Sequence, residues 1–202
     1  MTNVFLGVED SISGRCWTGP SITIDRQSEM IVQETNFPGA MANVLARMGV
    51  EANQAENFIN PSIRDSMPNP FKILDMDKAA SRINISVKNN DKIAIFADYD
   101  VDGATSGALL HDWLTQLGSI PTLYIPDRIE EGYGPNIDAM ETLAKTHDLI
   151  ICVDCGTLSH DPINKITDTD IIVLDHHLGG ETLPNAYAVV NPNRQDEEGN
   201  LF

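Results

Sequence analysis

Basic residues, cysteines and long apolar runs are all scarce in this chain, and each shortage narrows what the protein can be. The 202 residues include 13 Lys and Arg against 30 Asp and Glu, which gives a formal net charge of −17. Since nucleic-acid backbones are held mainly by Lys and Arg, this balance taken alone argues against a nucleic-acid-binding protein.

Long apolar segments are also missing. No run approaches the roughly 18 residues that a membrane span needs, and the N-terminus has no basic segment followed by an apolar one, as a secretory signal would. We therefore expect a cytoplasmic protein that does not bind membranes.

The three cysteines, Cys16, Cys152 and Cys155, are too few for a disulfide framework at this length. Cys152 and Cys155 form a CxxC motif, but redox motifs of this kind begin a helix, and zinc sites need a second ligand pair. Because Cys152 lies inside a predicted strand, we expect both to be buried small apolar residues. Redox or zinc chemistry is the alternative.

Three apolar runs end in acidic residues. The runs are KIAIFAD at 92–98, LIICVD at 149–154 and DIIVLD at 170–175. They predict buried strands of a parallel sheet, whose carboxyl ends share the edge where open α/β sheets bind ligands. Seven side chains should therefore converge: Asp98, Asp100, Asp102, Asp154, Asp175, His176 and His177. Because like charges this close repel each other, we expect a divalent metal site holding two ions.

The order of elements predicts an α/β fold. Strands are expected at 92–98, 122–126, 149–154, 170–174 and 186–190, with helices between them at 104–117, 135–146 and 160–166. This alternation indicates a doubly wound, mostly parallel five-stranded sheet covered on both faces, preceded by a small helical region. The predicted domains are an N-terminal extension and helical region at 1–87 and the α/β domain at 88–202. Residues 1–35 are weakly patterned.

The segment DYDVDG at 98–103 places acids at alternate positions where the first strand turns into a helix. Gly103 is expected to adopt a backbone conformation that other residues avoid. The amides at the start of the helix favour anions such as phosphate, and Thr105 and Ser106 would add hydroxyl donors. A calcium loop of the EF-hand type is excluded because no Glu stands at its twelfth position. A solvated acidic turn is the plain alternative.

The other two strand ends carry different chemistry. Asp154 has a plain interpretation, as the cap of the next helix. In Asp175-His176-His177, adjacent histidines point to opposite sides, so one can bind a metal while the other faces a substrate. Imidazole together with carboxylates suits Mn²⁺, Mg²⁺ or Zn²⁺.

The segment IPDRIEEGYGPN at 125–136 predicts a loop close to a ligand. Gly132 and Gly134 flank Tyr133, which is typical of a tight turn. The planar guanidinium of Arg128 fits phosphate oxygens. Pairing of Arg128 with one of the two glutamates that follow it is the alternative.

These motifs resemble the DHH phosphoesterase superfamily, which is named for the triplet at 175–177. Within it the sequence is most similar to the RecJ-type single-strand-specific 5′→3′ DNA exonucleases. The resemblance covers residues 38–202 and rests on motifs in the same order, namely DYDVDGATS (98–106), PDRIEEGYGPN (126–136), VDCG (153–156), LDHHLGGETLP (174–184) and VVNPN (189–193).

The resemblance also implies roles for individual residues. The implied metal ligands are Asp100, Asp102, Asp154 and His176. Asp98 would be a neighbouring ligand or an acid that supports the ligands, His177 would contact the scissile phosphate or the leaving group, and Arg128 would hold a phosphate. The expected substrate-binding residues are Arg128, Thr105, Ser106, Gly132, Tyr133 and Gly134.

The implied activity is phosphodiester hydrolysis with two Mn²⁺ or Mg²⁺ ions, by a 5′→3′ exonuclease specific for single-stranded DNA in DNA repair and recombination. The implied partners are single-stranded DNA, a single-strand-binding protein and a helicase. The acidity is compatible with this activity, since bound ions offset the charge of their ligands. Two alternatives stay open. One is a DHH-family phosphoesterase acting on oligonucleotides, cyclic dinucleotides or pyrophosphate, and the other is a non-catalytic DHH-like scaffold in a replication or repair complex.

The polar stretch at 191–202 follows a predicted strand directly, and we expect the sequence to be truncated there. The family's remaining ligand Asp, a second catalytic domain and an OB-type domain are expected beyond Phe202. Little nuclease activity is therefore expected from these 202 residues alone.

Overall fold

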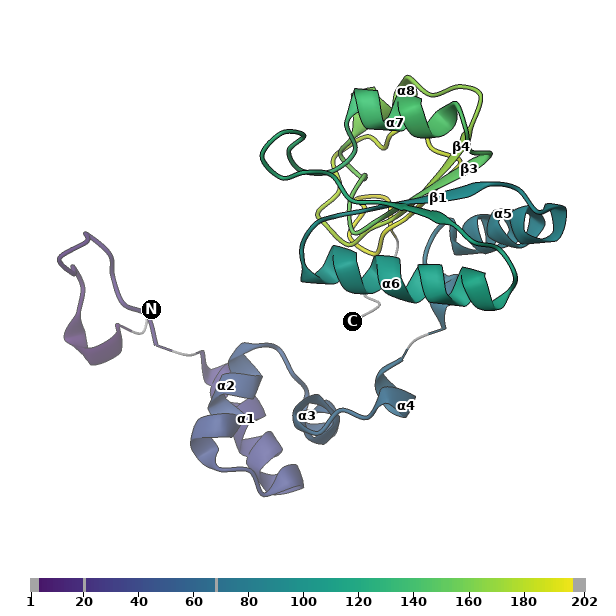
Figure 1. Cartoon of the computed structure of the whole chain (residues 1–202). Helices are drawn as coiled ribbons and strands as arrows, with labels where there is room; N and C mark the ends of the chain where they lie inside the picture. The colour runs from purple at the N-terminus through teal and green to yellow at the C-terminus, as the bar shows by residue number, and fades with distance from the viewer. Residues whose placement is uncertain (1–3, 20, 68, 198–202) are drawn as a thin grey trace. The chain divides into compact units, whose positions relative to one another are not determined.

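The computed structural model describes residues 4–19, 21–67 and 69–197. It divides the chain into two compact units, Met1–Met67 and Pro68–Phe202 (Figure 1). Each unit has its own hydrophobic core. The predicted truncation at residue 202 lies outside the described residues.

Helices build the first unit. They are η1 (Phe5–Gly7), α1 (Ile22–Thr35), α2 (Gly39–Arg47), α3 (Ala52–Ile59) and α4 (Ile63–Ser66). Small and branched apolar side chains form the core, which consists of Ile31, Ala42, Leu45, Ala46, Val50, Ala52 and Ala55. The helical region that the sequence predicts from residue 38 is therefore present.

Helix α1 was not predicted, because residues 1–35 carry little obvious pattern. The helix begins after Ser21, whose side chain accepts a hydrogen bond of 3.4 Å from the Ile24 amide, as N-cap residues commonly do. Ile24 and Ile31 lie seven residues apart on one face and pack into the core of the unit. The N-cap serine together with this spacing is the signal that would have identified the helix.

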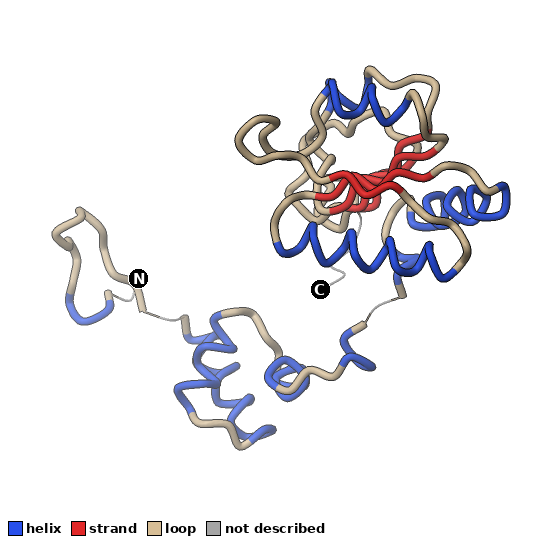
Figure 2. The backbone as a smooth tube through the Cα atoms, in the orientation of Figure 1, coloured by secondary structure: helices blue, strands red, loops and turns tan. Residues whose placement is uncertain are grey.

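The second unit is the predicted α/β fold. After η2 (Pro70–Lys72), its elements are α5 (Met76–Asn89), β1 (Ile93–Ala97), α6 (Val101–Gln116), β2 (Thr122–Tyr124), α7 (Ile137–Ala144), β3 (Leu149–Val153), α8 (His160–Asn164), β4 (Asp170–Leu174) and β5 (Ala188–Val190). The strands lie in the order β2-β1-β3-β4-β5, and every pair is parallel. Figure 2 shows these strands between helices. The predicted doubly wound, five-stranded sheet is confirmed.

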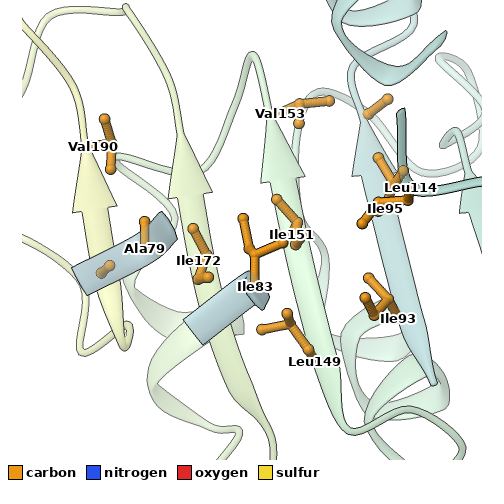
Figure 3. Close-up of a cluster of buried hydrophobic side chains, with 12 residues drawn as sticks. Ala79, Ile83, Ile93, Ile95, Leu114, Leu149, Ile151, Val153, Ile172 and Val190 are labelled. Atoms are coloured by element: carbon orange, nitrogen blue, oxygen red, sulfur yellow. The ribbon is translucent and has the colours of Figure 1, made fainter. Parts of the chain in front are cut away.

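Helix α5 packs on the sheet, although the sequence analysis assigned it to the helical region. Its Ala79 and Ile83 share a core with residues of the strands (Figure 3). The structure accordingly divides the chain between residues 67 and 68, whereas the predicted boundary was 87–88.

Alternate residues of each strand face opposite layers of helices, which explains the unbroken apolar runs. Ile93 and Ile95 belong to the core shared with α5 and α6, whereas Ala94 and Phe96 belong to the core shared with α7 and α8. Figure 1 shows α5 and α6 on one face of the sheet and α7 and α8 on the other. Because both faces are covered, polar chemistry is confined to the ends of the strands.

The direction in which strands are added reverses between β1 and β3. From β1 the chain runs outward to β2, returns past β1 to β3, and continues to β4 and β5. Loops at such a reversal leave towards opposite faces, and open α/β sheets bind ligands in the crevice between them.

The helices of the described residues include none with the length and apolar character required to cross a bilayer.

Candidate metal centre

The strand register brings three acids to the same level of the sheet. Ala97 pairs with Val153, and Val153 pairs with Leu174. The next residue on each strand is therefore Asp98, Asp154 or Asp175, and all three are buried. This convergence is the one that the apolar runs predicted.

Asp98 is 2% exposed, and its Oδ1 has no hydrogen-bond partner within the described part of the chain. Burial, aided by the charge of nearby Asp100, raises the pKa of Asp98. A buried carboxylate oxygen without a partner carries a cost of desolvation that a bound cation would remove.

The first turn of α6 lies directly against Asp98. A Cβ atom on Gly103 would sit 2.3 Å from the Asp98 carbonyl oxygen. Gly103 has helical backbone angles, so the expectation of an unusual conformation was wrong, and the glycine is needed for space. Its close approach brings the amides of α6 to the site.

Asp100 caps helix α6. Its Oδ1 accepts hydrogen bonds from the amides of Asp102 (2.9 Å) and Gly103 (3.0 Å). These bonds, that of Gly103 first, hold the pKa of Asp100 below its usual value. Asp100 is therefore an exposed, ionised carboxylate beside the two buried acids.

Asp154 follows β3, the strand that lies between β1 and β4 in the sheet. It is 5% exposed, and its φ of 61° falls in the left-handed region that favours glycine. Its Oδ1 is 3.0 Å from Nε2 of His176, whereas its buried Oδ2 has no partner within the described residues. Burial, followed by the effect of Asp100, raises the pKa of Asp154. Strain and an unsatisfied oxygen at one residue are typical of functional sites.

The last strand end orients a histidine. Asp175 Oδ1 lies 2.8 Å from Nδ1 of His177, and Thr157 donates its amide to Asp175 Oδ2 at 3.0 Å. Burial would raise the pKa of Asp175, but the bonds from Thr157 and His177 hold it below its usual value. The Asp175 carboxylate in turn raises the pKa of His177.

Two groups of side chains can each surround an ion, and Asp154 belongs to both. In each group one potential ligand atom per residue lies within 4.8 Å of the others. The groups are Asp98, Asp100 and Asp154, and Asp154, His176 and His177. Oxygen and imidazole donors of this kind suit Mn²⁺ or Mg²⁺ at the first group and Mn²⁺ or Zn²⁺ at the second. The residues therefore fit a pair of divalent ions.

Comparison with known proteins identifies the family of this chain. The family model described as "DHH family, N-terminal domain" matches residues 92–199. The chain belongs to the DHH family.

RecJ proteins are among the similar relatives. The single-stranded-DNA-specific exonuclease RecJ of Bacillus subtilis is 34% identical over 166 residues, which is 80% of this chain and 21% of that protein. RecJ of Haemophilus influenzae is 41% identical over 132 residues, or 63% of this chain and 23% of that protein. A crystal structure of exonuclease RecJ bound to manganese matches 66% of this chain and 34% of that one, with a TM-score of 0.59 and 30% identity. The chain thus spans less than a quarter of the length of the Bacillus subtilis and Haemophilus influenzae RecJ proteins.

Not every predicted metal ligand belongs to one of the two groups of potential ligands. Asp102 is exposed on the first turn of α6 and belongs to neither of them. The Thr105 hydroxyl donates to the Val101 carbonyl of its own helix at 2.8 Å. Ser106 is half-buried and lines a cavity together with Asp154 and His176.

The loop between β2 and α7 borders the site. The Tyr133 hydroxyl lies 3.2 Å from His177 Nδ1, and positive φ angles at Gly132 (84°) and Gly134 (73°) give the tight turn that the sequence predicted. The Arg128 guanidinium lies over the ring of Tyr99, 5.2 Å from its centroid. Within the described residues Arg128 forms no ion pair with the glutamates that follow it.

Cys152 and Cys155 are buried in the core between the sheet and α7 and α8. Burial raises the pKa of the Cys152 thiol to about 12 and that of Cys155 further still. Both features agree with the prediction of small apolar residues and disfavour thiolate chemistry.

The sequence analysis gave no role to the residues that hold the DHH triplet in place. Asn191 donates to the Thr157 hydroxyl and to the His177 carbonyl, each at 2.8 Å. Asn193 donates to the His176 carbonyl. The VVNPN motif contains both asparagines, so it marked their positions without revealing their partners.

Proposed function

We propose that this chain carries the metal-binding part of a phosphodiesterase that removes nucleotides from the 5′ end of single-stranded DNA. The observation that supports this most directly is the pair of ligand groups that share Asp154. Asp98 and Asp154 each have a buried carboxylate oxygen without a hydrogen-bond partner among the described residues. The names of the RecJ relatives supply the substrate.

In this proposal Asp98, Asp100 and Asp154 hold one Mn²⁺ or Mg²⁺ ion, and Asp154 and His176 hold the other. When bound, such a pair lowers the pKa of a coordinated water and offsets charge on the phosphate. Asp102 stays a predicted ligand on the strength of the resemblance alone.

The remaining side chains would bind and orient the substrate. His177 is held by Asp175 through Nδ1, and its Nε2, which lies 3.3 Å from the Tyr133 hydroxyl, would contact the scissile phosphate or the leaving oxygen. Arg128, whose guanidinium lies over the Tyr99 ring, would offer its planar fork of donors to a phosphate. The substrate-binding roles of Tyr133, Gly132, Gly134, Thr105 and Ser106 are part of the same proposal.

The cellular setting rests on the sequence prediction. A cytoplasmic role in DNA repair and recombination, together with a single-strand-binding protein and a helicase, stays a prediction. Single-stranded DNA is the partner that the names of the relatives support.

Metal binding provides the first test. Asp154→Asn removes the charge that both groups share, so Mn²⁺ affinity measured by titration calorimetry should fall at least 100-fold. Asp161→Asn, at an exposed acid of α8, should leave the affinity unchanged. Equal Mn²⁺ affinity in the two variants would contradict the proposed site.

The substrate provides the second test. Mn²⁺-dependent release of mononucleotides should be measured from 5′-ended and 5′-blocked single strands, duplex DNA and cyclic dinucleotides, and release of phosphate should be measured from pyrophosphate. Bacillus subtilis RecJ is the positive control. The proposal expects a preference for free 5′ ends of single strands. Turnover of only the small substrates would favour the other phosphoesterase function, and metal binding with no turnover by any longer protein that contains this chain would favour a scaffold.

A further inference from the structure

The segment that follows β5 lies along the DHH loop, which we define as residues 175–179. Asn193 donates from its side chain to the His176 carbonyl, and its own carbonyl accepts the Gly179 amide at 3.0 Å. The approach is close, since a Cβ atom on Gly179 would lie 2.9 Å from the Cα of Arg194. Because the two backbones are in contact, the position of one segment determines that of the other.

Arg194 holds this segment in place. Its side chain is only 9% exposed, and arginine is seldom buried without partners. Its Nη1 donates to Asp75 Oδ2 at 3.1 Å and to the Val189 carbonyl at 2.7 Å. Its Nε and Nη2 donate to the two oxygens of Asp196 at 2.7 and 2.8 Å. These bonds join the turn after β5 to β5 itself and to Asp75, the residue that precedes α5.

The contacts of Arg194 also occupy the open edge of the sheet. β5 is the last strand, and its Val190 carbonyl accepts the Asp175 amide on the side of β4, so the N–H and C=O of Val189 point to the open edge. The Val189 amide donates to Asp75 Oδ2 at 3.0 Å, and its carbonyl accepts from Arg194. The ion pair thus binds groups that an edge strand otherwise leaves unpaired. Arg194 is therefore fixed to the sheet that carries the acids of the site.

The position of His176 depends strongly on its backbone. Its side chain is 58% exposed, and its Nε2 lies 3.0 Å from Asp154 Oδ1. Because an exposed ring has few neighbours to hold it, the bond from Asn193 to the His176 carbonyl helps to determine where the ring lies.

We propose that Arg194 is a positioning residue for the metal centre. It fixes the segment after β5 to the edge of the sheet, and through Asn193 this segment holds the backbone from which His176 reaches Asp154. The effect on metal binding rests on the proposed function. The hold on the DHH loop exists in the metal-free protein and can be tested there.

The first variant is Arg194→Met, which keeps most of the length of the side chain but removes all of its donors. In metal-free protein, exchange of the Gly179 amide should accelerate about tenfold relative to that of the Ile151 amide in β3, because the Asn193 carbonyl that accepts it is no longer fixed. Mn²⁺ affinity should fall about tenfold, which is the lower end of the usual effect for residues that orient metal ligands without contacting the metal.

Arg82→Met is the matched control. The Arg82 side chain is also largely buried, at 14% exposed, and it pairs with Asp91 and Asp170. These partners lie at the amino ends of β1 and β4, so the pairing joins α5 to the opposite end of the sheet. Arg82→Met should lower the melting temperature, as Arg194→Met does, but should leave the relative Gly179 exchange and the Mn²⁺ affinity unchanged.

A second variant, Gly179→Ala, disturbs the same contact from the side of the DHH loop and leaves Arg194 intact. The amide of residue 179, corrected for its intrinsic rate, should exchange faster, and Mn²⁺ affinity should fall. Gly180→Ala is its control, because the nearest atom to the added Cβ would be in the exposed Leu158 side chain, at 3.3 Å, which can adjust. Both quantities should keep their wild-type values in this control.

These outcomes separate positioning from general stability. If Arg194→Met and Arg82→Met change Gly179 exchange and Mn²⁺ affinity equally, the inference is wrong. Faster Gly179 exchange with unchanged Mn²⁺ affinity would also overturn it. If Arg194→Met does not fold, wild-type exchange and affinity in Gly179→Ala would overturn it. If the wild-type chain binds no Mn²⁺, the proposed function fails, and the Gly179 exchange alone decides whether Arg194 holds the DHH loop.

Discussion

At Gly103, helix α6 touches the backbone of Asp98. The packing of the helix and the position of this acid therefore both depend on this residue. The nearest atoms to an added Cβ are the carbonyl oxygen, carbonyl carbon and Cα of Asp98, at 2.3, 2.6 and 2.8 Å. None of these atoms can move without moving the end of β1. Any side chain here must push α6 away from the strand that carries the acids.

We therefore predict that Gly103→Ala lowers the free energy of unfolding by about 3 kcal/mol, at the upper end of the usual range for overpacking. Mn²⁺ affinity should fall as well, because Asp100 caps the helix that is displaced. Urea unfolding and titration calorimetry measure the two effects.

Gly107→Ala is the matched control on the same helix. Its added Cβ would lie 3.1 Å from the Ala97 side chain and 3.4 Å from that of Leu123, which can adjust. The loss of stability should be smaller. Similar losses for the two variants would show that the contact with Asp98 is not the cause.

The positions of residues were predictable where strand register alone determines them. Asp98 and Asp154 follow apolar runs, and the ends of parallel strands must meet. The hydrogen bond from Asn191 to Thr157 was not predictable, because the two residues are 34 positions apart in the sequence and their loops meet only in the folded protein. Periodicity carries no information about such contacts.

Among the elements, the loop between β2 and α7 is held by two carboxylates. Asp127 accepts the amides of Ile129 (2.8 Å) and Glu130 (3.1 Å) within the loop. Glu131 accepts hydrogen bonds from the Tyr124 hydroxyl, the Asp127 amide (2.8 Å) and Asn136 Nδ2 (3.0 Å). The bond from Tyr124, followed by that from Asp127, holds the pKa of Glu131 below its ordinary value of 4.5. Arg128 and Tyr133 lie on the loop that these bonds fix.

The pH dependence of the loop follows from the direction of this shift. Because the pKa is lower in the folded state, the stabilisation from Glu131 is fully present above the unfolded value and is lost as pH falls through the folded value. We expect amide exchange in residues 127–135, corrected for its intrinsic pH dependence, to accelerate below pH 4.5. The amides of Glu130 and Ile129 also hold the pKa of Asp127 below its usual value, so Asp127 contributes to the same acceleration. Glu131→Gln should therefore reduce the acceleration, whereas Glu130→Gln, at the exposed neighbouring residue, should retain it in full.

Elements were predicted where their apolar pattern is dense, as in all five strands. Helix α1 was not predicted because its core contacts are spaced over two turns among polar residues. One of the buried residues on the same face, Ser28, is itself polar. A helix with so few apolar residues is stabilised by its packing partners, which a local pattern does not display.

For the whole molecule, the existence of two cores predicts separable stabilities. Leu45 is 2% exposed in the core of the first unit. Leu45→Ala should destabilise that unit by about 2–5 kcal/mol, the usual cost of such a cavity. Hydrogen exchange should accelerate over residues 22–59 and stay unchanged over the strands, and Mn²⁺ affinity should also be unchanged.

Val44→Ala serves as the control, because the neighbouring Val44 is 57% exposed. It should leave exchange nearly unchanged in both units. Faster exchange throughout the sheet in Leu45→Ala would mean that the two cores unfold together.

The division of the chain was harder to predict than its fold. The apolar face of α5 shows that the helix packs against something, but Ala79 and Ile83 fit a helical partner as well as a sheet. Only the structure shows that they pack with the strands.

At Asp154, a substitution that increases the stability of the fold would remove a potential metal ligand. Glycine would relax its φ of 61° and remove a buried carboxylate in a single step. A library of variants selected only for heat resistance would therefore tend to discard this acid, and the survivors would be more stable proteins without the carboxylate that the two proposed ion sites share. Engineering of this chain needs a screen for metal binding alongside any screen for stability.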